Sequence, residues 1–324
     1  MPGLRGRALF AWLLVCVFWG STYLAIKIGV DVLPPFLFAG LRFVAAGTLL
    51  AAGALAFGDR LPRRAVDWRR AAIAGVLLLA GGNAFVVWAE QYTASGVTSV
   101  FVVTVALWMA FFDSVIPGGS GSLGWRVVVG LVAGFVGTAL LVGANPREIL
   151  AADLRGPIAL TSASVFWSLG SIYAKRHPTE SSPYMTAAIQ MLAGGLVVTL
   201  VGTGLGEWSH WHLGGRGALA IAYLVVFGSI VGYSAYGYAL RHAPATIVGT
   251  YAYVNPVIAV LLGWLILGEQ VTGRMVVAIG LILAAVVWIQ LSHRTSLVVG
   301  KRSSADAPTT DAQNPSTSIR TEAA

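Results

Sequence analysis

The side chains that could bind or carry a solute lie inside long apolar stretches of the chain. Arg42 is the clearest case, because it stands within the run LPPFLFAGLRFVAAG. An arginine at membrane depth costs roughly 2.5–3.5 kcal/mol on the lenient insertion scale, so it is expected to face a cavity or a partner. The alternative is that Arg42, about 6 or 7 residues inside the stretch, extends to the interface or holds backbone carbonyls. We predict that Arg42 lines a substrate cavity.

An amide and a carboxylate share one face of the third apolar stretch. Asn83 and Glu90 are seven residues apart, which is two helical turns. Glu90 has three candidate roles: it pairs with Arg42, binds a cationic group of a substrate, or carries a proton. The alternative is an interfacial acid at the end of the helix, where the cost of a charge falls. For Asp113, near the end of the fourth stretch, a structural role is preferred.

Aromatic side chains with polar tips recur at helical spacing. Together with polar neighbours they define single faces of several stretches, and we predict that these faces line the cavity. Packing between helices is the alternative explanation, because polar and small side chains also mediate helix contacts in membranes. The residues included in this prediction are Trp19, Thr22, Tyr23, Trp167, Gln190, Tyr233, Tyr236, Tyr251 and Asn255.

The composition excludes several classes of protein. Only 10% of the 324 residues are charged and 57% are hydrophobic, whereas soluble domains average about 25% charged residues. The net charge of +8 comes from Lys and Arg scattered in short loops, which argues against nucleic-acid binding. The single Cys16 cannot form an intrachain disulfide, and no HExxH motif, Cys/His cluster or P-loop is present. The sequence therefore predicts no catalytic residue, metal or cofactor, and no drive by ATP.

Ten apolar stretches, each long enough to cross a bilayer core, predict an all-α membrane protein with ten transmembrane helices. Counting Lys and Arg on alternate sides gives fifteen against five when the N-terminus is inside, so both termini are expected to be cytoplasmic. The bulky residues after position 19 lack a cleavage site, so the first stretch is interpreted as a retained helix. The stretches lie at about 8–28, 35–57, 71–89, 96–116, 126–143, 157–174, 185–205, 217–240, 245–267 and 274–292.

The sequence also repeats internally. Phe18–Trp19 with Lys27 recurs as Phe166–Trp167 with Lys175, an offset of 148, and two further segments recur at offsets of 148 and 149. With five spans per half, the second half must enter the membrane inverted, and inverted repeats place a binding site between them. We predict repeats at 1–144 and 145–292 and a disordered cytoplasmic tail at 293–324.

The ninth stretch carries Asn255 and Pro256 near its centre. Proline removes a backbone donor, and an asparagine would find no partner in lipid, so this pair belongs beside other helices or a cavity. The matching first-half residues are Ala106 and Leu107. The two halves are therefore expected to differ in helix breaking, with any break that shapes the site supplied by the second half.

Two motifs resemble those of the EamA family of the drug/metabolite transporter superfamily, and its YedA-like branch in particular. One is Tyr253-Val254-Asn255-Pro256 followed by Leu267-Gly268-Glu269, and the other is the run Phe18 to Tyr23. The resemblance covers roughly residues 8–292. It implies a ten-helix inner-membrane carrier of two five-helix halves, usually an exporter of small metabolites.

The leading prediction is therefore a secondary transporter of a bacterial inner membrane. It would export a small metabolite, such as an amino acid or related compound, by exposing a central cavity to each side in turn. Its expected partners are the small-molecule substrate, the lipid bilayer, and protons or a counter-substrate, with Glu90 as the candidate proton carrier. A membrane-embedded sensor without transport and an intramembrane enzyme are the alternatives.

Overall fold

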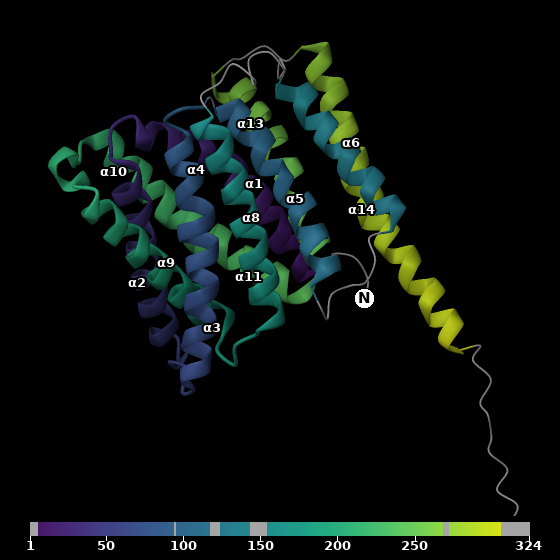
Figure 1. Ribbon diagram of the computed structural model, residues 1–324, viewed down its shortest axis with the longest axis horizontal. Coiled ribbons are helices and arrows are strands. Elements are labelled where there is room, and N and C mark those ends of the chain that lie inside the picture. The colour runs from purple at the N-terminus through teal and green to yellow at the C-terminus, as the bar shows by residue number, and fades with distance from the viewer. Residues whose placement is uncertain (1–5, 94, 117–123, 143–153, 268–271, 306–324) are drawn as a thin grey trace, which may run out of the picture.

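The computed structural model describes residues 6–93, 95–116, 124–142, 154–267 and 272–305. Within these residues all regular secondary structure is helical, and the helices form ten units, several of them apolar spans (Figure 1). The first half contains α1 (Arg7–Val30), α2 (Pro35–Ala56), a third unit of α3 (Ala65–Gly75), η1 (Val76–Asn83) and α4 (Ala84–Ala89), then α5 (Ser95–Val115) and α6 (Trp125–Val142). The predicted fold class is confirmed.

The second half follows the same order. It contains α8 (Arg155–Arg176), α9 (Pro183–Gly204), the short η2 (Glu207–His210), a unit of α10 (Gly215–Tyr223), η3 (Leu224–Tyr233) and α11 (Ser234–His242), a unit of α12 (Ala245–Gly249) and α13 (Tyr251–Leu267), and α14 (Gly273–Ala305). By length and composition five of the described units could cross a membrane outright: Arg7–Val30, Pro35–Ala56, Ala65–Ala89, Pro183–Gly204 and Gly215–His242.

Local sequence signals explain where several helices begin and end. Pro35 and Pro183 occupy the first helical positions of α2 and α9, where a missing N–H costs nothing. The Ser182 hydroxyl accepts a hydrogen bond from Met185 N at 3.1 Å and caps α9. At the other end of a helix, Lys27 lies in the last turn of α1, where a positive charge is favourable.

The two halves share a feature that their hydropathy does not reveal. The third unit of each half contains a π-helical segment, η1 beginning at Val76 and η3 beginning at Leu224, which are 148 residues apart. That spacing equals the offset of the sequence repeat. Each segment also lies in a unit whose end is held by a lysine: Lys27 Nζ donates to Glu90 O at 3.3 Å, and Lys175 Nζ donates to Leu240 O at 3.0 Å.

Close helix approach depends on glycine where neighbouring backbones meet. A Cβ at Gly194 would lie 2.5 Å from Gly75 O and 2.7 Å from the Leu79 Cβ. Because Gly194 and Gly75 have no side chains, α9 packs directly against α3 and η1. Figure 1 shows the other main pairing: α6 and α14 lie side by side at one edge of the bundle.

Two details of the second half concern the ninth span and the C-terminal segment. The ninth span is interrupted at Thr250, between α12 and α13, and α13 continues through Pro256. At Thr250 the backbone makes i→i+3 hydrogen bonds, from Thr250 N to Ile247 O at 3.3 Å and from Tyr253 N to Thr250 O at 3.1 Å. The interruption of this second-half span therefore lies at a local turn around Thr250, more than one helical turn before Asn255–Pro256.

The predicted tail at 293–324 lies only partly within the described residues. The helix α14 continues to Ala305, well past residue 292. Residues 306–324 of the predicted tail lie outside the described residues.

Candidate functional site

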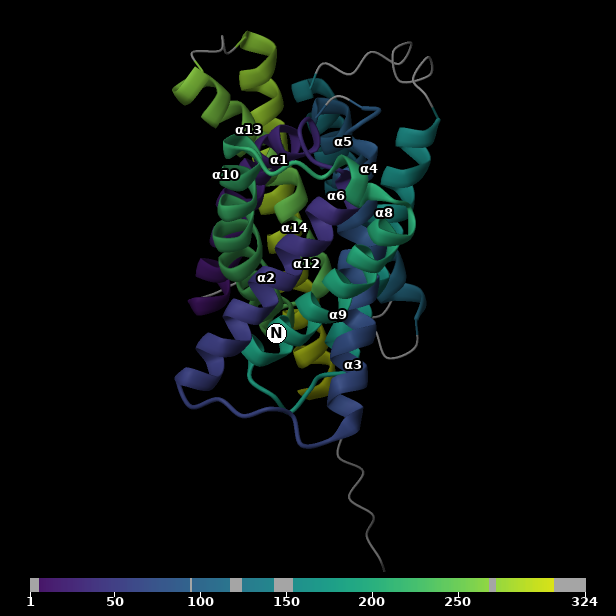
Figure 2. The same ribbon diagram turned by 90° about the vertical axis from the view of Figure 1, so that its left-hand side faces the viewer.

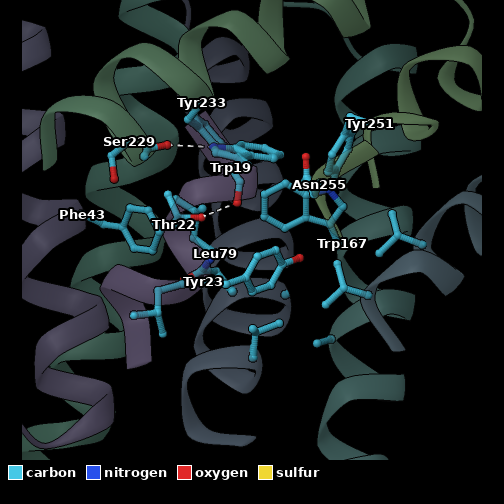
Figure 3. Close-up of a pocket in the computed structure, with 18 of the residues that line it drawn as sticks. Trp19, Thr22, Tyr23, Phe43, Leu79, Trp167, Ser229, Tyr233, Tyr251 and Asn255 are labelled. Carbon is cyan, nitrogen blue, oxygen red and sulfur yellow. Dashed lines mark hydrogen bonds between the residues drawn. The ribbon is translucent and has the colours of Figure 1, made fainter. Parts of the chain in front are cut away.

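A central cavity lies between the two halves, about 80 Å³ in volume and so large enough for several water molecules. Its walls come from α1, α2, η1, α4, α5, α8, η3 and α13, and Figure 3 shows most of the lining side chains. Nine of the predicted cavity residues line it: Trp19, Thr22, Tyr23, Arg42, Asn83, Trp167, Tyr233, Tyr251 and Asn255. Their role in binding stays a prediction, but the structure brings them to one place.

Arg42 supplies the charge of this cavity. Its side chain is 3% exposed, its Nη2 donates to Asn83 Oδ1, and its guanidinium lies 4.4 Å from the centre of the Phe43 ring. Nε makes no hydrogen bond within the described residues. The guanidinium is therefore held deep in the bundle by an amide and an aromatic face, and this geometry differs from the alternative of reaching back to the interface.

The aromatic wall is built on the repeat-related pair Trp19 and Trp167. Their rings meet edge to face, with centroids 5.3 Å apart and planes at 80°, a favourable arrangement for two aromatic quadrupoles. Trp19 also contacts the rings of Tyr236 at 5.1 Å and Tyr251 at 5.0 Å, and its Nε1 donates to Gly228 O at 2.9 Å. Two residues at the same position of the two repeats thus form the ring contact at the centre of the bundle.

Polar groups complete the wall. The Thr22 hydroxyl donates to Trp19 O at 2.8 Å, as Figure 3 shows. The hydroxyl of Tyr233 is buried and has no hydrogen-bond partner among the described residues. The Asn255 amide, oriented by its hydrogen bonds, donates to Tyr251 O at 3.1 Å and to Cys16 O at 3.2 Å. Asn255 therefore joins α13 to α1 while lining the cavity.

A second cavity, which we call the basic cavity, lies beside the central one and has a volume of about 40 Å³. It contains the remaining predicted residues Gln190 and Tyr236, and the Tyr236 hydroxyl lies 2.5 Å from Ser171 Oγ. Tyr233 lines both cavities. The aromatic residue Tyr233 therefore separates them. The basic cavity is lined by residues that include Arg70, Lys175, Thr179, Thr186, Gln190, Tyr233, Tyr236, Gly237 and Arg241.

Glu90 does not line either cavity. Its side chain is 0% exposed, and neither carboxylate oxygen has a hydrogen-bond partner among the described residues. Lys27 reaches its backbone carbonyl but forms its ion pair with Asp31, at 3.2 Å. The structure thus places Glu90 outside the cavity wall and next to the charged group of Lys27.

The acid Asp113 has a simpler environment. It forms an ion pair with Arg176 at 3.7 Å, and both side chains are largely buried. This contact joins α5 to α8 and agrees with the structural role preferred from the sequence. Among the described residues no group of three or more His, Cys, Asp or Glu side chains could hold a metal ion.

Several lining residues carry no chemical signal in the sequence. Phe43, Leu79, Val102 and Val105 line the central cavity, yet apolar side chains of these types also fill every other helix contact in the chain. Ser164 is a partial exception, because a buried serine in an apolar run is a polar residue at membrane depth. Its hydroxyl, however, donates to Leu160 O at 3.0 Å, one helical turn earlier.

A ten-helix bundle of two inverted repeats, with a partly polar cavity between them, is the architecture of a membrane transporter. The EamA-like transporter family matches residues 6–143 and 154–291, one match in each half. The inner membrane transporter YedA of Escherichia coli K12 is 39% identical over 285 residues, which cover 88% of this chain and 90% of YedA. The chain belongs to the EamA-like transporter family, whose members are transporters rather than enzymes.

Two further comparisons agree with this assignment. The transporter YoaV of Bacillus subtilis is 26% identical over 270 residues, covering 80% of this chain and 88% of YoaV. A solved crystal structure has the same fold, with a TM-score of 0.73 and 23% identity. That match covers 90% of this chain and all of the other.

Proposed function

We propose that this transporter is a secondary carrier that moves a small metabolite across a bacterial inner membrane by alternating access. The inner-membrane location is taken from the similarity to YedA. One observation supports the mechanism above all others: the central cavity lies between inverted repeats, and Trp19 and Trp167, the same position in each repeat, meet in its wall. Two related halves that share one site can expose it to either side by moving against each other.

The lining favours an amino acid or a related compound as the substrate. The Arg42 guanidinium offers a fixed positive charge to a carboxylate, and Asn83 and Asn255 offer amide groups. Trp19, Trp167 and the tyrosines around them form an apolar and aromatic surface for a side chain. The cavity volume of about 80 Å³ lies below the 300–1,000 Å³ of typical ligand sites, so binding requires the halves to separate. Export is the direction that we propose, with both termini on the cytoplasmic side.

Flux through proteoliposomes tests this function. Purified protein would be reconstituted and assayed for uptake or counterflow of a panel of labelled amino acids, with and without a pH gradient. We expect saturable flux in the wild type and at least a roughly tenfold loss in Arg42→Ala, because one charge-assisted hydrogen bond is worth about 1.5–3 kcal/mol. Arg64→Gln is the matched control, since Arg64 is exposed and pairs with Glu180 away from the cavity.

The outcomes separate the transporter from its proposed site. Arg42→Ala would first be checked for native helix content and a single oligomeric peak, with Arg42→Lys as a second variant that keeps the charge. Unchanged flux in folded Arg42→Ala would remove Arg42 from the substrate path. No flux of any panel member in the wild type would contradict the proposed substrate class and favour the sensor alternative.

A further inference from the structure

The basic cavity concentrates positive charge. Arg70, Lys175 and Arg241 line it, and none of its lining residues within the described part of the chain is an acid. The three cations come from α3, α8 and α11, so the cluster exists only in the folded bundle. Arg70 Nη1 donates to Pro178 O, in the loop that joins α8 to α9, at 3.0 Å, and α11 packs against α1. Figure 2 shows this loop and the loop that joins α2 to α3 at the end of the bundle where α1 begins.

These cations are oriented by neutral oxygens. Arg241 Nη2 donates to Thr179 Oγ1 at 3.0 Å and to Thr186 Oγ1 at 2.8 Å. Lys175 Nζ donates to the carbonyls of Leu240 and Ala243. Hydrogen bonds of this kind fix the side chains but leave their charge uncompensated, which is unfavourable in a partly buried site until an anion arrives.

The nearby acids are engaged elsewhere. Asp113 acts electrostatically on Lys175, but its carboxylate pairs with Arg176 at 3.7 Å. Glu180 pairs with Arg64, and Asp59 accepts from Ser182. The Asp67 carboxylate accepts from Glu180 N at 3.4 Å. Asp59 and Asp67 keep their negative charge because their partners are neutral donors, but neither lines the cavity, whose described lining carries three cations and no acid.

Comparison of the two repeats shows that this cluster of cations belongs to one end of the molecule. In the first half Lys27 forms an ion pair with Asp31, four residues later, at 3.2 Å. In the second half the equivalent lysine, Lys175, is followed four residues later by Thr179. Arg241 in turn corresponds to Gln91, Tyr92 or Thr93 at offsets of 150 to 148, all uncharged. The second half therefore has a threonine where the first half has an acid, and an arginine where the first half has uncharged residues.

The basic cavity also adjoins the transport route. Tyr233 lines it on one side and the central cavity on the other, and its buried hydroxyl has no hydrogen-bond partner among the described residues. An anion held by Arg70, Lys175 and Arg241 would lie one aromatic side chain away from the cavity that contains Arg42 and Trp19.

We propose that the basic cavity is a second binding site, which takes the carboxylate of a small organic anion at the end of the bundle where α1 begins. Binding there rests on the chemistry of this cavity. Its place on the path of a transported substrate rests on the proposed function. The site would attract carboxylate-bearing solutes toward Tyr233 from the end of the bundle where α1 begins. The other end would not attract them in this way, because the repeat-related Lys27 is already paired with Asp31.

Cysteine labelling in the full-length protein measures this directly. Gly237 lines the cavity and a Cβ there meets no atom within 4 Å, so Gly237→Cys introduces a thiol without a clash. The native Cys16 is 1% exposed, and the wild type serves as its labelling control. We expect Gly237→Cys to react faster with an anionic than with a cationic thiosulfonate. Acetate at about 100 mM, a concentration suited to a site with weak affinity, should slow the labelling, whereas the neutral acetamide should not.

Charge removal supplies the decisive comparison. Adding Arg241→Gln should lower the anionic-to-cationic rate ratio about fivefold, because one unit charge roughly 8 Å away across water changes the local concentration of each reagent about 2.3-fold in opposite directions. Arg70→Gln should act likewise if folding limits the Arg241 variant. Arg64→Gln removes the same charge outside the cavity and should leave the ratio nearly unchanged.

Three results would overturn the proposal: no preference for the anionic reagent, a ratio that Arg241→Gln and Arg70→Gln leave unchanged, or no protection by acetate. Labelling in phosphatidylcholine vesicles with and without phosphatidylglycerol identifies the source of the oxyanion. Protection by phosphatidylglycerol without protection by acetate would overturn the assignment to a soluble anion in favour of a lipid headgroup. No transport is measured, so these outcomes are independent of the flux assay.

Discussion

Arg42 remains buried because its surroundings replace water on several sides. Asn83 accepts one of its hydrogen bonds, Phe43 offers a ring face at 4.4 Å, and the residue lines the cavity. A guanidinium has five donors in a rigid fork, so a partner with two oxygens fits the unused side well. A buried guanidinium with unpaired donors is therefore suited to bind a carboxylate.

Glu90 gives the clearest prediction for a single side chain. Its carboxyl group is buried and without a hydrogen-bond partner among the described residues, and a group in that position favours its neutral form unless a nearby cation holds its charge. We propose that Glu90 takes up and releases a proton during transport. In Glu90→Gln, flux should no longer respond to a pH gradient, whereas counterflow without a gradient should persist.

The measurement is the ratio of flux with a gradient to flux without one. Glu180→Gln is the control, because Glu180 is exposed at the opposite end of the bundle. If Glu90→Gln responds to the gradient as strongly as the wild type does, Glu90 is not the proton carrier.

Sequence reasoning located the polar residues at membrane depth but not their exact neighbours. Arg42, Asn83 and Asn255 were recognisable because such side chains are expensive in lipid. Glu90 shares a helical face with Asn83, yet the central cavity includes Val86 but not Glu90, and the end of that unit packs beside Lys27. Helical periodicity specifies a face of a helix, whereas the length of a cavity along that face depends on the neighbouring helices.

The distance between neighbouring helices in this bundle depends on the size of the residues at a few helix crossings. Gly194→Ala should lower stability by about 1–3 kcal/mol, because its Cβ would overlap Gly75 O and force α9 away from α3. Gly53→Ala is the matched control: a Cβ there meets nothing within 4 Å, and alanine favours the helix by about 0.5–1 kcal/mol. Unfolding by denaturing detergent compares the two, and equal stability in both variants would contradict the crossing argument.

The first turn of α2 depends on a residue far away in the sequence. Glu207, in η2, accepts hydrogen bonds from Phe36 N at 3.2 Å and from Leu37 N at 2.7 Å. A carboxylate at a helix N-terminus is stabilised both by these donors and by the helix dipole. Glu207→Ala should therefore destabilise the protein by about 1–2 kcal/mol in the same unfolding assay. A loss no larger than that of exposed Glu180→Ala would show that the cap contributes little.

The interrupted units could not be predicted in the same way as the helices themselves. The segments VLLLAGGN and LVVFGSIVGY, which form η1 and η3, are as apolar as any membrane helix. A π-helical turn adds one residue per turn without a characteristic composition. Pro256 was a visible helix breaker, but it lies inside α13, next to the Asn255 amide that donates to Tyr251 O and to Cys16 O of α1.

Over the whole molecule, the repeat was the most productive signal in the sequence. An offset of 148 residues predicted the pairing of Trp19 with Trp167 as equivalent positions, and the structure places their rings in contact. The basic cavity was missed, because Arg70, Lys175 and Arg241 were interpreted as topology signals. Comparing the residues four positions after Lys27 and Lys175 would have indicated it, since an acid in one half is replaced by threonine in the other.

Orientation in the membrane gives a prediction for the chain as a unit. Lys and Arg favour the side of the N-terminus by fifteen to five. Alkaline phosphatase fused after His212 should be active in the periplasm, whereas a fusion after Pro178 should be inactive. A fluorescent protein fused at the C-terminus should be bright in the cytoplasm. The reversed pattern would contradict the proposed orientation, because the end of the bundle that contains the basic cavity would then face the periplasm.

The contact between Glu207 and the start of α2 limits how this end of the bundle can open. Glu207 follows α9 along the chain, and α9 packs along α2, with Gly40 against Thr199. A cap at one end and a tight crossing further along join the two helices at two separated points, which prevents one from rotating about the other. Opening at this end would then carry α2, α9 and η2 as a single rigid body, and the hinges must lie in other helices.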